Sequence, residues 1–586
     1  MTTSGTTQHL RGRVRRRRTA TALLAAGATA ALAACGGGGP APAAQDASSA
    51  GLVAGDQLPT YTAIDLVEPD FPGVDGSTPG FLSVPDPLVQ AFDEPPGAGG
   101  SYTAMTPLWG TIPPTEGNAY FDAVNAAMGT DITFQISDGN TYGDKLAAVL
   151  ASPDDLADWV TIPSWNVPPR FGQAVETIFQ DLAPYLAGDA VEDYPYLANI
   201  PTEAWQACAW NGRLYGLPFP QELGVTDYAF YRSDLLPDAQ MPTTADEMID
   251  FVEENTKDGH WGTNDLWTTA TVMFGVPPEW VVGDDGTLVH RVETPQYRAA
   301  LEWMAELYAS GAVHPDAVAD NQGDAAQRFE SGQVLVNSGG VGWWHEALTR
   351  NRAVDPSFDM RPFPVIAADG GTPTVYKSRG AAMCSYLKKA DDATITELLG
   401  AANFLASPFG TAEYQLINYG VEGTHYTLDE AGLPVPTAQA QTEVQPSYIF
   451  LVDPPVVNAK VSLPDYVEAF SEWTATNAAY VVEPPFYGMN ITEPAQFASL
   501  DTPFVDLEKS IARGRADLSD LDAAVETWRS SGGEELRAFY QEIYDAQQEG
   551  GASGTDAGTD SGTDAGTDSG TDSGTDSGTD SGTDES

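Results

Sequence analysis

In the first part of the chain's body, the spacing of hydrophobic residues changes from one segment to the next. Apolar residues at every second position predict a half-buried strand over 131–137, and strand-like segments cover 103–108 and 159–162. Apolar residues three or four positions apart predict helices over 118–128 and 145–151. This order of strands and helices is typical of an α/β fold with a mostly parallel sheet.

Two tryptophans follow the ends of predicted strands. Trp109 comes directly after the first strand, and Trp165 comes shortly after the third. Ligands of parallel sheets bind beyond the carboxyl ends of the strands. We therefore expect Trp109 and Trp165 to be pocket residues, with a place in the core as an equally open alternative.

The N-terminal segment has the order of a secretory signal. Six arginines precede an apolar run over 19–34 that is too short to span a bilayer. The run ends in Leu32-Ala-Ala-Cys35-Gly, which resembles the lipobox of bacterial lipoproteins. The resemblance implies a signal peptide over 1–34, acylation of Cys35 and retention on the outer face of the cell membrane. The arginine run also suggests twin-arginine export, but the residues expected after Arg-Arg are absent.

Low-complexity segments flank the body. Gly, Pro, Ala and Ser dominate residues 35–100, which we interpret as a flexible tether with a few apolar residues that dock locally. Gly-Thr-Asp repeats make residues 548–586 an acidic, disordered tail. The body of about 450 residues exceeds the usual size of a single hydrophobic core, so the sequence predicts at least two lobes.

Seven segments of the body resemble, in the same order, segments of bacterial extracellular solute-binding proteins of ABC importers. The resemblance is to the large sugar-binding branch of that family, and its clearest motif is Asn418-Tyr-Gly-Val-Glu-Gly-Thr-His-Tyr426. The matching segments are 211–218, 228–236, 242–248, 285–311, 329–344, 418–426 and 525–544. The resemblance implies a two-lobed fold with the ligand in the cleft between the lobes.

The same resemblance sets the expected lobe boundaries. Residues 101–219 and 365–409 form the first lobe, and residues 220–364 and 410–547 form the second. The chain then passes between the lobes several times.

Nine residues are candidates for ligand binding, because each lies beyond an apolar strand or beside a glycine-containing loop. Aromatic rings cover the flat faces of sugars, and polar groups bind their hydroxyls. The aromatic candidates are Trp165, Trp343, Trp344 and Tyr419, with Trp109 and Tyr376 as second choices, and the polar candidates are Glu222, Arg379 and Glu422. Core packing and ion pairs between the lobes are the alternative roles of these residues.

Charge and spacing exclude several function classes. The net charge of -56 excludes a nucleic-acid-binding protein, which needs a basic surface. The histidines are isolated and no nucleophile-elbow or zinc motif occurs, so we expect no catalytic residues, although the many carboxylates leave a glycosidase pair open. Residues 255–265 replace a calcium loop of related receptors but keep few oxygen ligands at the required spacing. We therefore expect neither a metal nor a cofactor.

Two cysteines remain if Cys35 carries lipid. Cys208 and Cys384 would lie in an oxidising compartment, where they can form a disulfide, but we favour two buried free thiols, which are at least as common. Their separation in the chain excludes a CxxC metal or redox motif.

Together, these features predict a monomeric lipoprotein that binds an oligosaccharide and delivers it to the permease subunits of an ABC importer. A receptor for a peptide or another polar solute is an alternative, because a fold does not determine its ligand. A surface-tethered polysaccharide-degrading enzyme is an alternative of a different class.

Overall fold

The structure, a computed structural model, describes residues 53–74, 76–168, 170–321, 323–430 and 432–554. The predicted signal peptide, the lipobox with Cys35 and the tail beyond residue 554 lie outside the described residues. Within the described ranges, no helix has both the length and the apolar character needed to cross a membrane.

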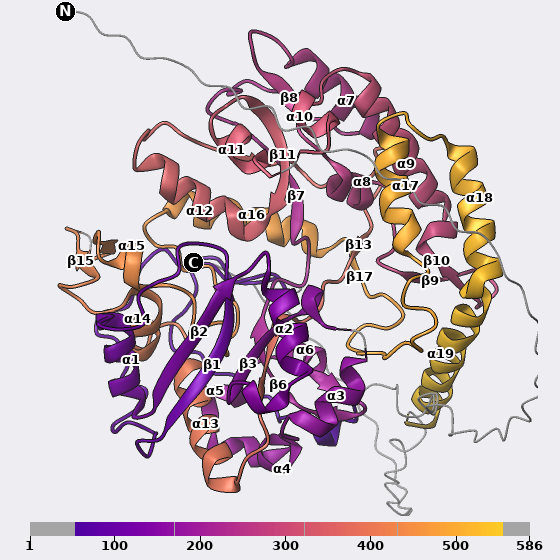
Figure 1. Ribbon diagram of the computed structural model, residues 1–586. Coiled ribbons are helices and arrows are strands. Elements are labelled where there is room, and N and C mark those ends of the chain that lie inside the picture. The colour runs from indigo at the N-terminus through magenta and orange to yellow at the C-terminus, as the bar shows by residue number, and fades with distance from the viewer. Residues whose placement is uncertain (1–52, 75, 169, 322, 431, 555–586) are drawn as a thin grey trace, which may run out of the picture. The chain divides into compact units, whose positions relative to one another are not determined.

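The first of two larger sheets has five strands (Figure 1). Their spatial order is β2 (Asp131–Asp138), β1 (Ser101–Leu108), β3 (Trp159–Pro163), β14 (Ala381–Leu387) and β6 (Gly216–Pro220). β1 runs parallel to β2 and β3, whereas β14 runs antiparallel to β3 and β6. The predicted strands and their parallel pairing are therefore confirmed. The carboxyl ends of β1, β3 and β6 lie at one edge of the sheet.

Helices cover both faces of this sheet and complete lobe 1. The first helix begins where the Asn118 side chain accepts hydrogen bonds from two backbone amides, and it ends at Gly129, whose positive φ of 73° suits glycine. One buried cluster includes Val124, Trp205 and Leu398. A second buried cluster includes Leu146 of the second helix and Phe171 of the third. The helices of lobe 1 are α1 (Ala119–Met128), α2 (Tyr142–Leu150), α3 (Phe171–Ile178), α4 (Ala183–Leu186), α5 (Pro195–Ala198), α6 (Thr202–Ala207), α13 (Asp392–Leu405), α14 (Ala412–Tyr419) and α15 (Ala440–Glu443).

The second sheet belongs to lobe 2. Its strands lie in the order β12 (Arg361–Pro362), β7 (Asp227–Tyr231), β11 (Val334–Gly340) and β8 (Trp261–Thr263). β11 runs antiparallel to β7 and parallel to β8, and Asp227 pairs with Gly340. The start of β7 and the ends of β11 and β8 therefore share one edge.

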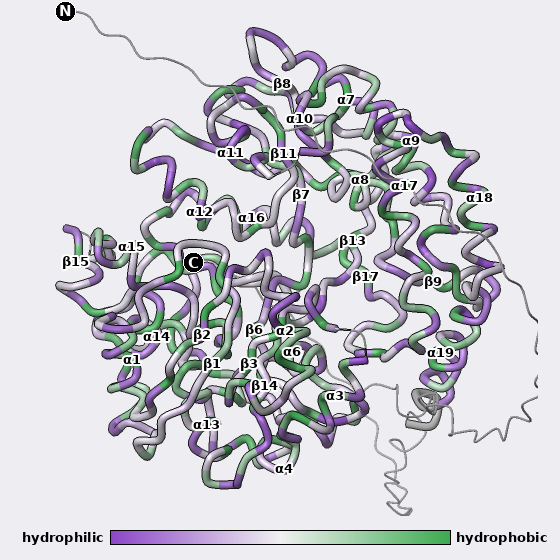
Figure 2. Tube along the Cα trace, in the orientation of Figure 1, coloured by the Kyte–Doolittle hydropathy of each residue, from purple (hydrophilic) through white to green (hydrophobic). Residues whose placement is uncertain are grey.

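The helices of lobe 2 are amphipathic where they pack on this sheet. In α9, buried residues such as Tyr297, Leu301 and Met304 recur at helical spacing, and Figure 2 shows hydrophobic and hydrophilic positions alternating along it. The helices are α7 (Ala245–Glu254), α8 (Trp267–Met273), α9 (Pro295–Ala309), α10 (Pro315–Val318), α11 (Ala325–Glu330), α12 (Val341–Arg352), α16 (Pro464–Ala478), α17 (Thr502–Ala512), α18 (Leu518–Trp528) and α19 (Glu534–Gly554).

Four two-stranded pairs complete the described strands. They are β4 (Ala209–Trp210) with β5 (Arg213–Leu214), β9 (Trp280–Val282) with β10 (Leu288–His290), β13 (Val375–Tyr376) with β17 (Val481–Val482), and β15 (Tyr426–Leu428) with β16 (Pro434–Pro436). Three of the described segments lead directly from an element of one lobe to an element of the other. Residues 221–226 link β6 to β7, residues 377–380 link β13 to β14, and residues 453–463 lead from lobe 1 to α16.

The segment expected to be a tether is ordered from residue 53 onward. Leu58 and Phe81 are buried, Gly80 forms a backbone bridge with Asn458, and Val89 forms one with Thr411. These contacts join residues far apart in the chain, so the local composition gave no sign of them. The expectation of a flexible segment over 35–100 is therefore wrong for its described part.

Two lobe boundaries also differ from the expected ones. Val365 and Val375 are buried with the core of lobe 2, so lobe 1 resumes at β14 and not at residue 365. Ile417 and Tyr448 are buried with the core of lobe 1, which places residues 410–452 there. Tyr448 donates a hydrogen bond of 2.7 Å to the side chain of Asn125, a tertiary contact without a periodic signal in the sequence.

Candidate ligand-binding site

An open aromatic surface lies at the strand-end edge of lobe 1. Trp109 follows β1 and Trp165 follows β3, and their ring centroids are 5.8 Å apart. The exposed fractions are 43% for Trp109 and 60% for Trp165, which are high for tryptophan. The Phe450 ring supports Trp109 edge-on at 6.2 Å. The sheet edge thus brings two of the predicted aromatic candidates together and leaves them accessible.

A group of ionisable side chains lies where lobe 1, lobe 2 and their connections meet. We call Glu222, Glu346, Asp453 and Lys460 the interlobe polar cluster. Glu222 lies on the first connection, Asp453 and Lys460 lie on the third, and Glu346 lies on α12 of lobe 2. Lys460 interacts electrostatically with Asp453 and Glu346. Besides burial, the charges of Glu222 and Glu346 both act on the Tyr466 hydroxyl and raise its pKa. Residues from three parts of the chain therefore share one electrostatic environment.

Desolvation dominates the electrostatics of this cluster. Burial raises the pKa of the Glu222 carboxyl to about 7, although a hydrogen bond from the Thr78 hydroxyl acts in the opposite direction. Burial also raises the pKa of Asp453 and Glu346 and lowers the pKa of the Lys460 ammonium. Lys460 and Glu346 are nevertheless exposed to solvent. A side chain that is partly shielded from bulk water but still reached by solvent is expected in a recess between two surfaces, and the cluster fits such a recess.

A cavity of about 550 Å³ adjoins the aromatic surface. Ser164 and Val167, on either side of Trp165 in the chain, belong to its lining. Lobe 2 contributes Glu279, Trp280 and Tyr376 of β13, and the second connection contributes Arg379. Two more predicted candidates, Tyr376 and Arg379, therefore line one cavity that both lobes form.

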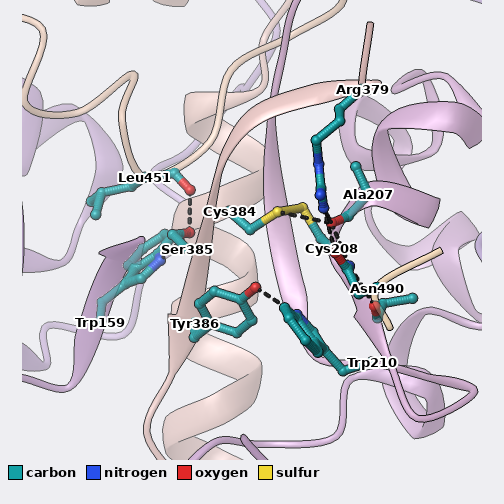
Figure 3. The surroundings of a disulfide bond; sticks show 11 residues. Trp159, Ala207, Cys208, Trp210, Arg379, Cys384, Ser385, Tyr386, Leu451 and Asn490 are labelled. Carbon is teal, nitrogen blue, oxygen red and sulfur yellow. Dashed lines mark hydrogen bonds between the residues drawn. A yellow bond between two sulfur atoms is a disulfide. The ribbon is translucent and has the colours of Figure 1, made fainter. Parts of the chain in front are cut away.

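Arg379 is held in place by lobe 1 and by the chain after β17, as Figure 3 shows. Its guanidinium donates hydrogen bonds to the Ala207 carbonyl and to the Asn490 side chain. Asn490 in turn donates to the carbonyls of Ala207 and Ala209, at 2.9 and 2.7 Å. Arg379 thus shapes the cavity wall, and part of its hydrogen-bonding capacity is used internally.

A disulfide joins the two cysteines beside this arginine. Cys208 follows α6 and Cys384 lies in β14, and their Cα atoms are 5.6 Å apart. The sequence favoured two free thiols over a disulfide, and the structure has the disulfide. It connects the segment after α6 to a central strand of lobe 1, next to the second connection.

Glu222 also faces two further cavities. One, of about 500 Å³, is lined by the ordered N-terminal segment, the first connection and residues 455–457. The other, of about 280 Å³, includes Lys377 and Trp473. Glu222 therefore lies between cavities at the hinge, in agreement with its expected place near a connection between the lobes.

Trp344 does not have the accessible face expected of it. Its exposed fraction is 0%, and its ring packs against Tyr466 and Phe230 at centroid distances of 4.9 and 5.7 Å. Trp343 is partly buried against Phe329, and its indole donates a hydrogen bond of 3.0 Å to Glu330. The sequence placed both in a glycine-rich loop, whereas they lie in the first turns of α12, which turn Trp344 into the core.

The remaining two candidates lie on lobe 1 at the end of α14. Tyr419 is partly buried and donates a hydrogen bond of 3.3 Å to the Ala459 carbonyl on the third connection. Its ring contacts Tyr426, which forms a backbone bridge with the exposed Glu422. Tyr419 thus contacts the segment that carries the interlobe polar cluster, while Glu422 lies on the neighbouring loop.

Among the residues that the structure describes, no three His, Cys, Asp or Glu side chains are arranged to hold a metal ion. The accessible indoles, the carboxylates and the cavities around the connections are instead the elements of a solute-recognition site. Residues 119–421 match the family of bacterial extracellular solute-binding proteins. The chain belongs to this family.

Relatives and solved structures agree with this membership. The Bacillus subtilis (strain 168) polygalacturonan/rhamnogalacturonan-binding protein YtcQ is 24% identical over 425 residues, which cover 68% of this chain and 83% of YtcQ. Lipoprotein LipO of the same organism is 21% identical over 490 residues, covering 76% of this chain and 92% of LipO. The crystal structure of the alginate-binding protein AlgQ2 without calcium ion has a TM-score of 0.55 at 15% identity and covers 78% of this chain and all of AlgQ2. The two-lobed α/β fold is thereby shown.

Sequence reasoning missed several residues of this solute-binding protein's site. Asp453 and Lys460 lie in a Pro- and Val-containing segment without periodicity, and Glu346 lies on the exposed part of a helix. Asp227 alone among these residues could have been found from the sequence, because it is the first residue of the strand that directly follows the first connection. Burial raises the pKa of Asp227 to about 6, which indicates that its carboxylate faces a partly desolvated space at the sheet edge.

Proposed function

We propose that this solute-binding protein binds an oligosaccharide between its lobes and delivers it to the permease subunits of an ABC importer. The accessible pair of Trp109 and Trp165, next to a cavity that both lobes line, carries this proposal. Indole rings cover the apolar faces of sugar rings, and carboxylates accept hydrogen bonds from sugar hydroxyls. The names of YtcQ and AlgQ2, which refer to polysaccharides, support a carbohydrate ligand.

The proposal includes the location and the assembly of the receptor. The protein is a monomer anchored on the outer face of the cell membrane through lipid on Cys35. The family is described as extracellular, and one relative is named a lipoprotein, which supports this location. The carboxylates of the site accept hydrogen bonds from the ligand and do not cleave it.

Calorimetric titration of the purified full-length protein with a panel of neutral and acidic oligosaccharides tests the proposal. We expect saturable binding of at least one oligosaccharide, and chromatography of the recovered ligand should show it unchanged. Binding of peptides with no binding of any oligosaccharide would contradict the carbohydrate ligand. Shortened products would instead identify an enzyme.

A further inference from the structure

Carboxylates around the site outnumber the cations close to them, and Asp453 and Glu346 share one cation, Lys460. Glu222, Glu346 and Asp453 of the interlobe polar cluster, Asp227 at the sheet edge and Glu279 in the 550 Å³ cavity form no ion pair within 4.0 Å with a described residue. Glu222 accepts one hydrogen bond from Thr78, and Glu279 accepts one from Trp280. Buried or crowded carboxylates in proteins are usually paired, so this group is unusual.

The cations near the site, in contrast, already have partners. Arg379 donates to Asn490 and Ala207. The Lys377 ammonium lies 3.5 Å from Glu483 and 3.8 Å from Glu203. It also lies 4.3 Å from the centre of the Tyr487 ring. Lys460 interacts with two carboxylates, Asp453 and Glu346. A ligand anion would therefore compete with carboxylates for Lys377 and Lys460, whereas Arg379 has neutral partners and keeps part of its hydrogen-bonding capacity.

Apart from the hydrogen bonds that Thr78 and Trp280 donate, these carboxylate oxygens keep acceptor capacity for a ligand. A carboxylate has room for several hydrogen bonds, and sugar hydroxyls are donors that fit such a site. A carboxylate on the ligand would instead stand beside like charges in a partly desolvated space, where repulsion is strong. Hydroxyl-rich ligands and acidic ligands should therefore differ clearly in affinity.

We infer that the site selects neutral, hydroxyl-rich oligosaccharides and discriminates against oligosaccharides that carry uronate groups. This inference rests on the proposed function, since it concerns the same ligand. It separates this chain from its relative YtcQ, which is named for polygalacturonan, a uronate polymer. At 24% identity, the two chains have ample room for different residues at the site.

Matched ligand pairs test the inference. The two oligosaccharides of a pair have the same glycosidic linkage and the same number of sugar units. They differ only at C6, which is a hydroxymethyl group in one member and a carboxylate in the other. Oligogalacturonate with its carboxyl-reduced form, and cello-oligosaccharide with its C6-oxidised form, are such pairs. Calorimetry of the full-length protein at pH 7.5 gives the Kd for each member. In every pair that binds, we expect the neutral member to bind at least about tenfold more tightly.

Variants locate the origin of the preference. Asp227 has a pKa raised by burial to about 6 and is ionised at pH 7.5. Asp227→Asn and Glu346→Gln each remove a carboxylate of the site, so each should narrow the affinity ratio between the members of a pair. Glu302→Gln is the matched control, because Glu302 is exposed on α9 and its replacement removes the same charge elsewhere. Thermal unfolding of each variant checks that it is folded.

Two results would overturn the inference, and they are distinguishable. If uronate members bind as tightly as their neutral counterparts or more tightly, the charge argument fails while the proposed function stands. If no member of any pair binds, this inference fails, and the proposed function fails as well if no oligosaccharide of the panel binds.

Discussion

Replacing Trp165 with alanine should weaken ligand binding and leave the fold intact. Trp165 has the largest exposed fraction of the aromatic candidates, 60%. A tryptophan of about 250 Å² therefore leaves about 150 Å² open, and a sugar ring on one face covers about half of that. At about 25 cal/mol per Å², the lost contact is worth about 2 kcal/mol, or roughly a 25-fold increase in Kd.

The assay is calorimetric titration with the oligosaccharide that binds the wild type, together with thermal unfolding. We expect Trp165→Ala to change the melting temperature by only a degree or two, because most of the ring contacts solvent. Trp165→Phe keeps a smaller aromatic face and should recover part of the affinity.

Trp344→Ala gives the contrasting result and serves as a control. Trp344 is buried against Tyr466 and Phe230, so its truncation should cost about 3–5 kcal/mol of stability. A Trp165→Ala protein with wild-type affinity would refute the assignment of the aromatic surface. A Trp165→Ala protein that unfolds like Trp344→Ala would show that the ring is structural.

Three further changes have defined outcomes. Replacing Cys208 and Cys384 together with serine opens a loop of 176 residues, so unfolding should become easier by up to about 5 kcal/mol; an unchanged melting temperature would contradict a stabilising disulfide. Glu222 has a pKa raised to about 7, so its contribution to stability is complete below the usual pKa of 4.5 and is lost as pH rises through 7. Glu222→Gln should therefore gain stability relative to the wild type between pH 4.5 and 8, and parallel pH profiles of the two melting temperatures would show that the raised pKa is wrong. Cys35→Ala should move the protein from the membrane to the soluble fraction of cells; recovery of the wild type free of lipid would contradict the anchor.

The parts of the fold that the sequence predicted are those with short-range signals. The alternation of Ile132, Phe134 and Ile136 located β2 because a strand turns every second side chain to one face. Trp109 and Trp165 were correctly expected beyond strand ends, since the parallel order of β1 and β3 fixes where their carboxyl ends lie. The order of strands and helices in the sequence could not show that the rings of Trp109 and Trp165 contact each other.

Features that depend on contacts between distant segments escaped prediction. The N-terminal segment is rich in Gly and Pro, but Phe81 is buried against Phe409, more than three hundred residues away in the chain. Trp343 and Trp344 are neighbours in the sequence, and the helical rotation between them decides which one enters the core. Composition and periodicity contain neither kind of information.

The site is also where the chain departs most from the rules that make proteins stable. Trp165 leaves a large apolar face in water, and Asp453 and Glu346 are desolvated without an ion pair within 4.0 Å to any residue that the structure describes. Elsewhere, charged groups of this chain pair in the usual way, as Arg232 does with Asp234 at 2.7 Å. Departures of this kind are expected where a ligand supplies the missing partner. When the ligand binds, the indole ring is covered by an apolar surface and the carboxylates accept hydrogen bonds. The open indole and the desolvated carboxylates both gain partners when a ligand binds, which is the strongest physical reason to place the ligand between the lobes.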